Sequence, residues 1–138
     1  MGVIPILVKR AITLKVKVTG SYKESVLRDL EKNLNQVELE LQQLEFQGKR
    51  YLQEVEKHGA EPIAAVKQRL EREKQKRLEL RDKMRQKQIE VAGWQIGSEV
   101  VQGTLEGMVD LSVGDTMDRL LQAEVIVQDG VILEIRNG

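Results

Sequence analysis

The chain has few of the residues from which catalytic and metal sites are usually built. Its 138 residues include no cysteine and a single histidine, His58. Without cysteine there is no disulfide framework and no thiolate zinc site, which fits a reducing compartment. A metal site at His58 would need carboxylates, and the nearby Glu56 and Glu61 follow no ligand spacing. We therefore expect no catalytic residue, no metal and no cofactor.

Aromatic residues and long apolar runs are also scarce. Aromatics make up 3% of the chain, less than a compact domain of this size normally buries, which indicates a large solvated helical surface beside a modest core. No apolar run approaches the ~20 residues of a membrane-spanning helix. Residues 1–8 are apolar but lack the charged segment and the cleavage site of a secretory signal. We expect no membrane span and a cytoplasmic protein.

Charge is balanced over the whole chain but is uneven along it. Lys and Arg number 22, and Asp and Glu also number 22. Residues 1–23 and 67–88 are net basic, whereas residues 24–56 and 97–138 are net acidic. The favoured interpretation is internal, with each basic segment lying against an acidic one.

A second interpretation of the basic residues is a surface for nucleic acid. Lys74, Lys76 and Arg81 form the candidate basic face, which could bind a phosphate backbone. Acids are interspersed with these residues, and no aromatic is interleaved for base stacking. A solvated helix facing an acidic neighbour is therefore the favoured interpretation.

Two apolar ladders in the middle of the chain predict an antiparallel coiled-coil hairpin. Their steps alternate between three and four residues, the spacing of heptad core positions. The ladders are Leu27, Leu30, Leu34, Val37, Leu41, Leu44, Gly48, Tyr51, Val55 and Ile63, Val66, Leu70, Glu73, Arg77, Leu80, Met84, Lys87, Val91. Folding the chain at residues 57–62 gives a regular register. It sets Tyr51 against Leu70, Leu41 against Leu80 and Gly48 opposite Glu73.

The ends of the two predicted helices carry stop and start signals. The first helix should run from about Tyr22 to Lys57, with Ser21 as its N-cap. The second should begin near Pro62 and end near Gly93, where glycine can take a left-handed cap.

The flanking segments predict a small β-domain. Ile12, Leu14, Val16 and Val18 alternate with polar residues, the pattern of a half-buried strand. Residues 96–138 look β-rich, with candidate strands at 98–105 and 108–113 that are broken by Gly103, Gly107 and Gly114. Asp129-Gly130 is a strong hairpin signal. The N-terminal strand has no other partner, so it should join the C-terminal strands.

The expected fold class is therefore α+β. A long antiparallel coiled-coil hairpin, residues 21–94 with its tip at 57–62, is inserted in a small β-sheet or barrel domain. Residues 1–20 and 95–138 form that β-domain. Trp94 is expected to pack where the two meet.

Four apolar side chains fall outside the predicted helical seam. Leu39 and Phe46 are one heptad apart on the first helix, and Leu52 and Leu78 also lie off the seam. We interpret them as a candidate interface for a protein partner or a second copy of the chain.

The whole layout resembles the YlqD-like family of bacterial proteins. The resemblance covers nearly the whole chain. It depends on Ile12-Thr13-Leu14-Lys15, a charged coiled coil, Val113-Gly114-Asp115 and the run Val125 to Ile132. It implies a fold and a bacterial cytoplasm. The family carries no established activity, so no catalytic residue is transferred.

Two functional classes remain open from the sequence, and an enzyme is the third and least favoured. The first is a non-enzymatic interaction or scaffold protein whose helical arm contacts a partner or a second copy, with a nucleic-acid- or ribosome-associated binding protein as its alternative form. The second is an adaptor of the membrane-fusion type, because the segment from Gly107 to Asp115 looks like a lipoyl-type half-motif.

Overall fold

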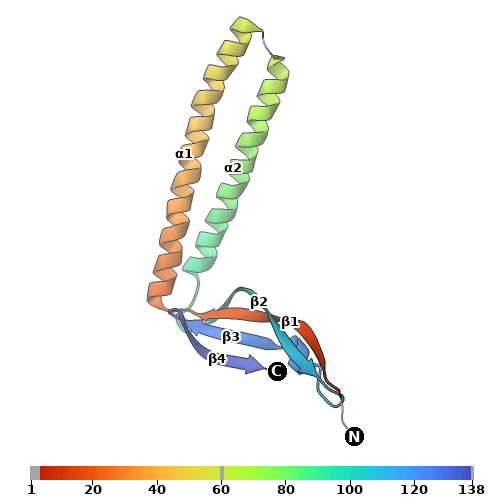
Figure 1. Ribbon diagram of the computed structural model, residues 1–138. Helices are drawn as coiled ribbons and strands as arrows, with labels where there is room; N and C mark the ends of the chain where they lie inside the picture. The colour runs from red at the N-terminus through yellow and green to blue at the C-terminus, as the bar shows by residue number, and fades with distance from the viewer. Residues whose placement is uncertain (1–3, 60, 138) are drawn as a thin grey trace. The chain divides into compact units, whose positions relative to one another are not determined.

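The computed structural model describes residues 4–59 and 61–137. The chain divides into two compact units. Glu24–Gly93 form the helical unit, and the described residues before and after this stretch form the sheet unit. The α+β class predicted from the sequence is confirmed, with a mixed four-stranded sheet and a long helical hairpin (Figure 1).

The sheet unit joins the two ends of the chain. Its strands are β1 (Ile6–Lys17), β2 (Glu99–Leu111), β3 (Ala123–Gln128) and β4 (Val131–Asn137), in the order β2-β1-β3-β4. Strand β1 pairs antiparallel with β2 and parallel with β3, and β3 pairs antiparallel with β4. The prediction that the N-terminal strand joins the C-terminal strands is confirmed.

The alternation of β1 separates an apolar face of the sheet from a charged one. Leu14 and Val16 lie level with Val125 and Val127 of β3, so apolar side chains meet on one face. On the other face, the Lys15 ammonium pairs with a carboxylate oxygen of Glu124. The basic strand and the acidic C-terminal segment therefore contact each other, as the charge pattern predicted.

An ion pair connects the two edge strands. The Arg136 guanidinium on β4 lies 2.7 Å from a Glu99 carboxylate oxygen on β2, although β1 and β3 separate these strands in the sheet. The sheet must curl for this pair to form. The hydrogen bond from Arg136 also holds the pKa of Glu99 below its usual range.

Two glycine positions explain details of the strands. The β3–β4 turn has Asp129 and Gly130 at φ 48° and 81°, the type I′ geometry that the Asp-Gly signal predicted. Strand β2 is continuous, whereas the sequence suggested two strands broken by glycines. Gly107 lies within this strand, where a larger residue would collide with its neighbour: a Cβ at this position would stand only 2.5 Å from Ile12 Cδ1.

The helices are α1 (Gly20–His58), α2 (Ile63–Ala92) and the short α3 (Asp118–Leu121). The predicted spans of the two long helices are confirmed to within a few residues, but both predicted caps are wrong. Thr19 Oγ1, rather than Ser21, accepts the hydrogen bond from the Tyr22 backbone N–H at 3.1 Å. Gly93 has φ −85° and takes no left-handed cap.

The hairpin is antiparallel, but its predicted register is wrong in the middle. Val55 and Val66 near the tip are buried, as expected of core positions. A Cβ at Gly48 would lie 3.2 Å from the Leu70 side chain, so Gly48 faces Leu70 and not Glu73. Tyr51, the predicted partner of Leu70, is exposed.

The physical reason for this shift is the space that glycine leaves. The isobutyl group of Leu70 fills the space beside Gly48, whereas the regular register would set the Glu73 carboxylate there. Leu80, the predicted partner of Leu41, is 43% exposed. Leu78 lies inward in its place.

Candidate interaction groove

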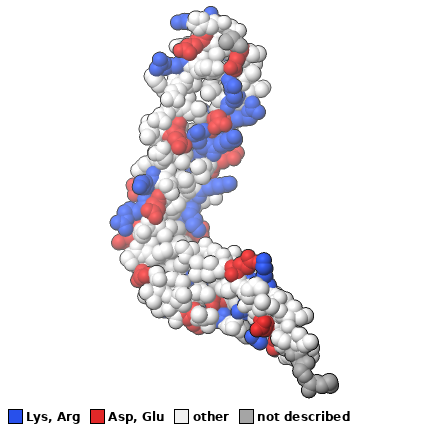
Figure 2. Space-filling model, in the orientation of Figure 1, with Lys and Arg blue, Asp and Glu red and all other residues white. Residues whose placement is uncertain are grey.

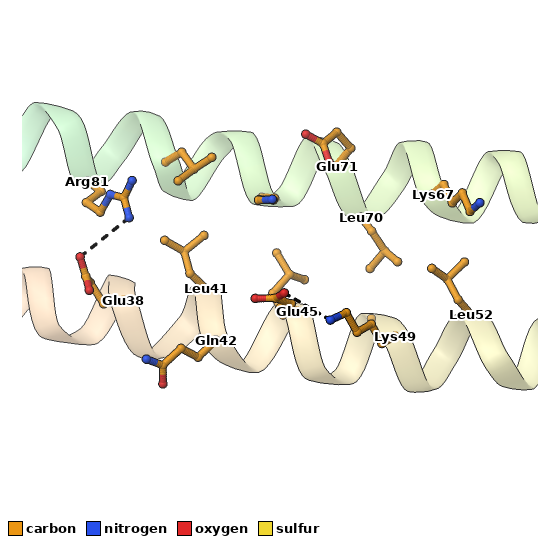
Figure 3. Close-up of a pocket in the computed structure, with 14 residues that line it drawn as sticks. Glu38, Leu41, Gln42, Glu45, Lys49, Leu52, Lys67, Leu70, Glu71 and Arg81 are labelled. Carbon is orange, nitrogen blue, oxygen red and sulfur yellow. Dashed lines mark ion pairs between the residues drawn. The ribbon is translucent and has the colours of Figure 1, made fainter.

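A groove of about 500 Å³ runs along one face of the hairpin between α1 and α2. Its apolar lining consists of leucines from both helices that are neither fully buried nor fully exposed. These groove leucines are Leu41, Leu44, Leu52, Leu70 and Leu78. In Figure 3, the labelled leucines of each helix point toward the opposite helix.

Charged side chains border the groove on both helices. The α1 rim carries Glu38, Glu45 and Lys49, and the α2 rim carries Lys67, Glu71, Lys74 and Arg81. Glu38 lies 3.9 Å from Arg81 across the groove, and Glu45 lies 3.4 Å from Lys49 on the same helix (Figure 3). Within the described part of the chain, Lys67 and Lys74 form no ion pair. The rim therefore offers unpaired positive charge beside apolar surface.

The opposite face of the same hairpin is bridged by polar contacts. The Arg77 guanidinium lies 3.4 Å from a Glu40 carboxylate oxygen and 3.0 Å from one of Glu73. The Tyr51 hydroxyl donates to Glu61 at 3.0 Å, and Glu61 pairs with Arg69 at 2.8 Å. We call this side the ion-paired face. The hydrogen bond from Arg77, and a second one from Lys76, hold the pKa of Glu73 below its usual range.

An interruption of the heptad in α2 creates the groove, and the sequence prediction missed it. The inward positions run from Arg77 to Arg81 and then to Met84, so one step of four replaces the expected step of three. The next step, from Arg81 to Met84, is three instead of four, so only the position between Arg77 and Met84 changes. Leu80 consequently points outward, and Leu78 lines the groove. The sequence did carry one signal of this change. Leu78 and Leu80 both follow the polar ladder positions Glu73 and Arg77, so either leucine could have been the inward one.

The four residues of the predicted interface do not form one stripe. Leu39 and Phe46 are 48% and 64% exposed, and the Arg50 guanidinium lies 5.9 Å from the Phe46 ring centroid. Leu52 and Leu78 line the groove instead. They were assigned to the outer surface because the regular register placed Tyr51 and Leu80 inward.

The three residues of the predicted basic face are likewise divided. Lys74 and Arg81 lie on the groove rim, whereas Lys76 pairs with Glu73 at 3.4 Å. Across the seam, Arg85 of α2 pairs with Glu38 of α1 at 3.0 Å. Figure 2 shows positive and negative side chains interspersed along the hairpin. The interhelical pairs fit the internal interpretation of the charge pattern.

Comparison with known proteins places this architecture in a family. The YlqD protein family matches residues 6–136. The chain belongs to the YlqD family. A crystal structure of a protein of unknown function from Synechococcus sp. WH 8102 is similar to this YlqD-family chain, with a TM-score of 0.80 and 27% identity. The match covers 96% of this chain and 95% of that one. A search of curated proteins gave no match.

The remaining predicted features of this YlqD-family protein lie outside the groove. Trp94 stacks on Tyr22 within the sheet unit, with ring centroids 6.0 Å apart and planes 1° from parallel. Its carbonyl accepts a hydrogen bond from Lys23 Nζ at 3.0 Å. His58 is exposed at the end of α1. Across residues 4–59 and 61–137, no cluster of three or more His, Cys, Asp or Glu is arranged to hold a metal ion.

The sheet unit also exposes apolar side chains. Edge strand β4 has four of them exposed by 52% to 68%: Val131, Ile132, Leu133 and Ile135. The segment from Gly107 to Asp115 spans the end of β2 and the turn after it. In the described residues, no helix is long and apolar enough to cross a membrane.

Proposed function

We propose that this YlqD-family protein is a non-enzymatic scaffold that binds an amphipathic helix in the groove of its helical hairpin. The observation that carries the proposal is the row of half-exposed groove leucines along one face of the hairpin. We place this function in the bacterial cytoplasm, as the family resemblance implies.

The length of the groove matches a helical ligand. From Glu38 to Leu52 the α1 side of the groove extends about 21 Å, or roughly four helical turns, at the usual rise per residue. Binding of an amphipathic helix to such a groove uses apolar side chains at positions i, i+3, i+4 and i+7. The two helices alone bury the groove leucines only in part. A third helix would remove the rest of their apolar surface from water.

The rim defines the chemistry of the ligand. Both signs of charge border the groove, with mainly acids on the α1 rim and mainly bases on the α2 rim. A helix with basic residues on one flank and acidic residues on the other would match both rims. A nucleic acid would leave the acidic rim unpaired, and the separation of Lys76 from Lys74 and Arg81 argues against a continuous phosphate-binding face.

The test uses a designed peptide as the probe. A labelled helical peptide with leucines at i, i+3, i+4 and i+7, flanked by Lys and Glu, is titrated with protein diluted until its mass is that of a single 15.7 kDa chain. Fluorescence anisotropy should show saturable binding, and a proline-interrupted peptide should not bind. No saturable binding of the helical peptide would refute the proposal.

Groove variants then locate the binding site. Leu52→Asp and Leu78→Asp should each raise the dissociation constant of the peptide at least about thirtyfold. Phe46→Glu, on the exposed outer surface of α1, should change it by less than about twofold. Circular dichroism checks that each variant keeps its helices. If the aspartate variants lose helix, Leu52→Ala and Leu78→Ala replace them.

A further inference from the structure

We propose that the helix bound in the groove comes from a second copy of this chain, whose own groove closes on the first. The inference rests on the proposed function and names its partner. In this arrangement two hairpins pack face to face as a four-helix bundle, and both sets of groove leucines become buried. The observation that carries it is the match of each groove rim to the other rim of a second copy.

Two-fold symmetry allows two ways of stacking the hairpins face to face. In the first, the axis runs along the helices, α1 of each copy lies over α2 of the other, and the two tips are at the same end. In the second, the axis runs across the helices, each helix lies over its own copy, and the tips are at opposite ends. The two arrangements differ in which charges meet.

The net charge of the helices favours the first arrangement. Residues 24–56 carry eight acids and four bases, whereas residues 67–88 carry ten bases and four acids. Stacking each helix on its own copy would set acidic on acidic and basic on basic. Stacking α1 on α2 sets opposite charges together.

The groove rims match residue by residue in the first arrangement. Gly48 lies level with Leu70, and Glu38 lies level with Arg81. These two offsets differ by one residue, and that of the Glu38–Arg81 pair places Glu45 level with Lys74. In the dimer, Glu45 of each copy therefore lies over Lys74 of the other.

The match continues along the rim with both signs. Lys49 lies within one residue of the level of Glu71, and Glu38 lies level with Arg81. Each of these three levels brings opposite charges together twice, once on each side of the two-fold axis. Lys74, which has no ion pair in the described single chain, gains a partner in this dimer.

Charge reversal and mixing test the arrangement on the full chain. By light scattering after gel filtration, the wild-type protein should have twice the 15.7 kDa chain mass. Lys74→Glu and Glu45→Lys should each raise the dimer dissociation constant at least about tenfold, because each sets like charges together twice. Each variant alone should therefore run as a single chain at concentrations where the wild type is dimeric.

Mixing the two variants is the decisive step. In a mixed dimer the introduced Glu at position 74 meets the introduced Lys at position 45, and the native Glu45 meets the native Lys74. An equimolar mixture should therefore regain the mass of a dimer. A pair made only within one chain would not be restored by mixing. Lys83→Glu, an exposed reversal outside the groove rim, is the matched control and should leave the dimer unchanged.

Three results would overturn the inference. If the wild type has the mass of a single chain at every concentration, the inference that a second copy fills the groove is wrong. Binding of the designed peptide would in that case still support the proposed function. A dimer that Phe46→Glu dissociates and the rim reversals do not would place the interface on the outer surface of α1. A dimer that none of these variants weakens would place it in the sheet unit.

Discussion

The two long faces of the hairpin are built from the same two helices but expose different chemistry. On the ion-paired face, Arg77 and Glu61 connect α1 to α2 through charged and hydroxyl groups. On the groove face, the leucines are only partly covered and Lys67 and Lys74 have no ion-pair partner in the described chain. The charged groups named on the ion-paired face find their partners within one chain, whereas the groove face keeps apolar surface that another helix could bury.

This difference separates stability from binding. Exposed ion pairs contribute little to stability, typically less than about 1 kcal/mol each. Half-buried leucines contribute more, and they gain further when another helix covers them. The groove face should therefore respond strongly to apolar substitutions, and the ion-paired face should respond mainly to pH and salt.

The largest expected effect comes from the leucine that packs on Gly48. Leu70→Ala should lower the free energy of unfolding by about 2 kcal/mol, at the low end for core leucines because the side chain is half exposed. Leu80→Ala, on the same helix but exposed, should change it by less than about 0.5 kcal/mol. Urea unfolding at a fixed protein concentration measures both. Equal losses would favour the regular heptad register.

The next effect tests the space beside Gly48. Gly48→Leu should destabilise the hairpin by about 1–2 kcal/mol, because its Cβ already lies within 3.2 Å of the Leu70 side chain. Gly48→Ala should be close to neutral, since the gain in helix propensity of about 1 kcal/mol opposes a small displacement of Leu70. The same urea titrations measure both variants. A stabilising Gly48→Leu would show that the seam is looser than described.

The smallest effect is electrostatic and lies on the ion-paired face. Arg77 holds the pKa of Glu73 low in the folded protein, so this contribution is present above the unfolded pKa of the carboxyl and is lost as pH falls through the folded pKa. Arg77→Met should therefore make stability less sensitive to acid. Lys83→Met removes an exposed charge outside these pairs and serves as the control. Identical acid profiles for the two variants would contradict the role of Arg77.

The sequence predicted the fold because its strongest signals are local. The alternation of β1, the Asp129-Gly130 turn and the two apolar ladders each specify an element without reference to the rest of the chain. Pairing of β1 with the C-terminal strands followed because no other segment could complete a sheet. The continuity of β2 was missed because Gly107 accommodates Ile12, a contact that no local pattern contains.

The groove was harder to predict because it depends on a single change of step. A regular heptad through Glu73 and Arg77 predicted Leu80 inward, and it consequently placed Leu52 and Leu78 outside. The choice between two registers is made by the packing of Leu70 on Gly48, an interaction between residues of different helices. Sequence periodicity alone gives both registers similar support.

The distance between the two hairpin tips tests the central claim most directly. The chain contains no cysteine, so the exposed His58 can be replaced by His58→Cys as a single site for a spin label. Pulsed electron spin resonance should give a distance below about 30 Å if α1 of each copy lies over α2 of the other with the tips at the same end. A distance of about 40 Å or more, or no dipolar coupling between chains, would contradict the account.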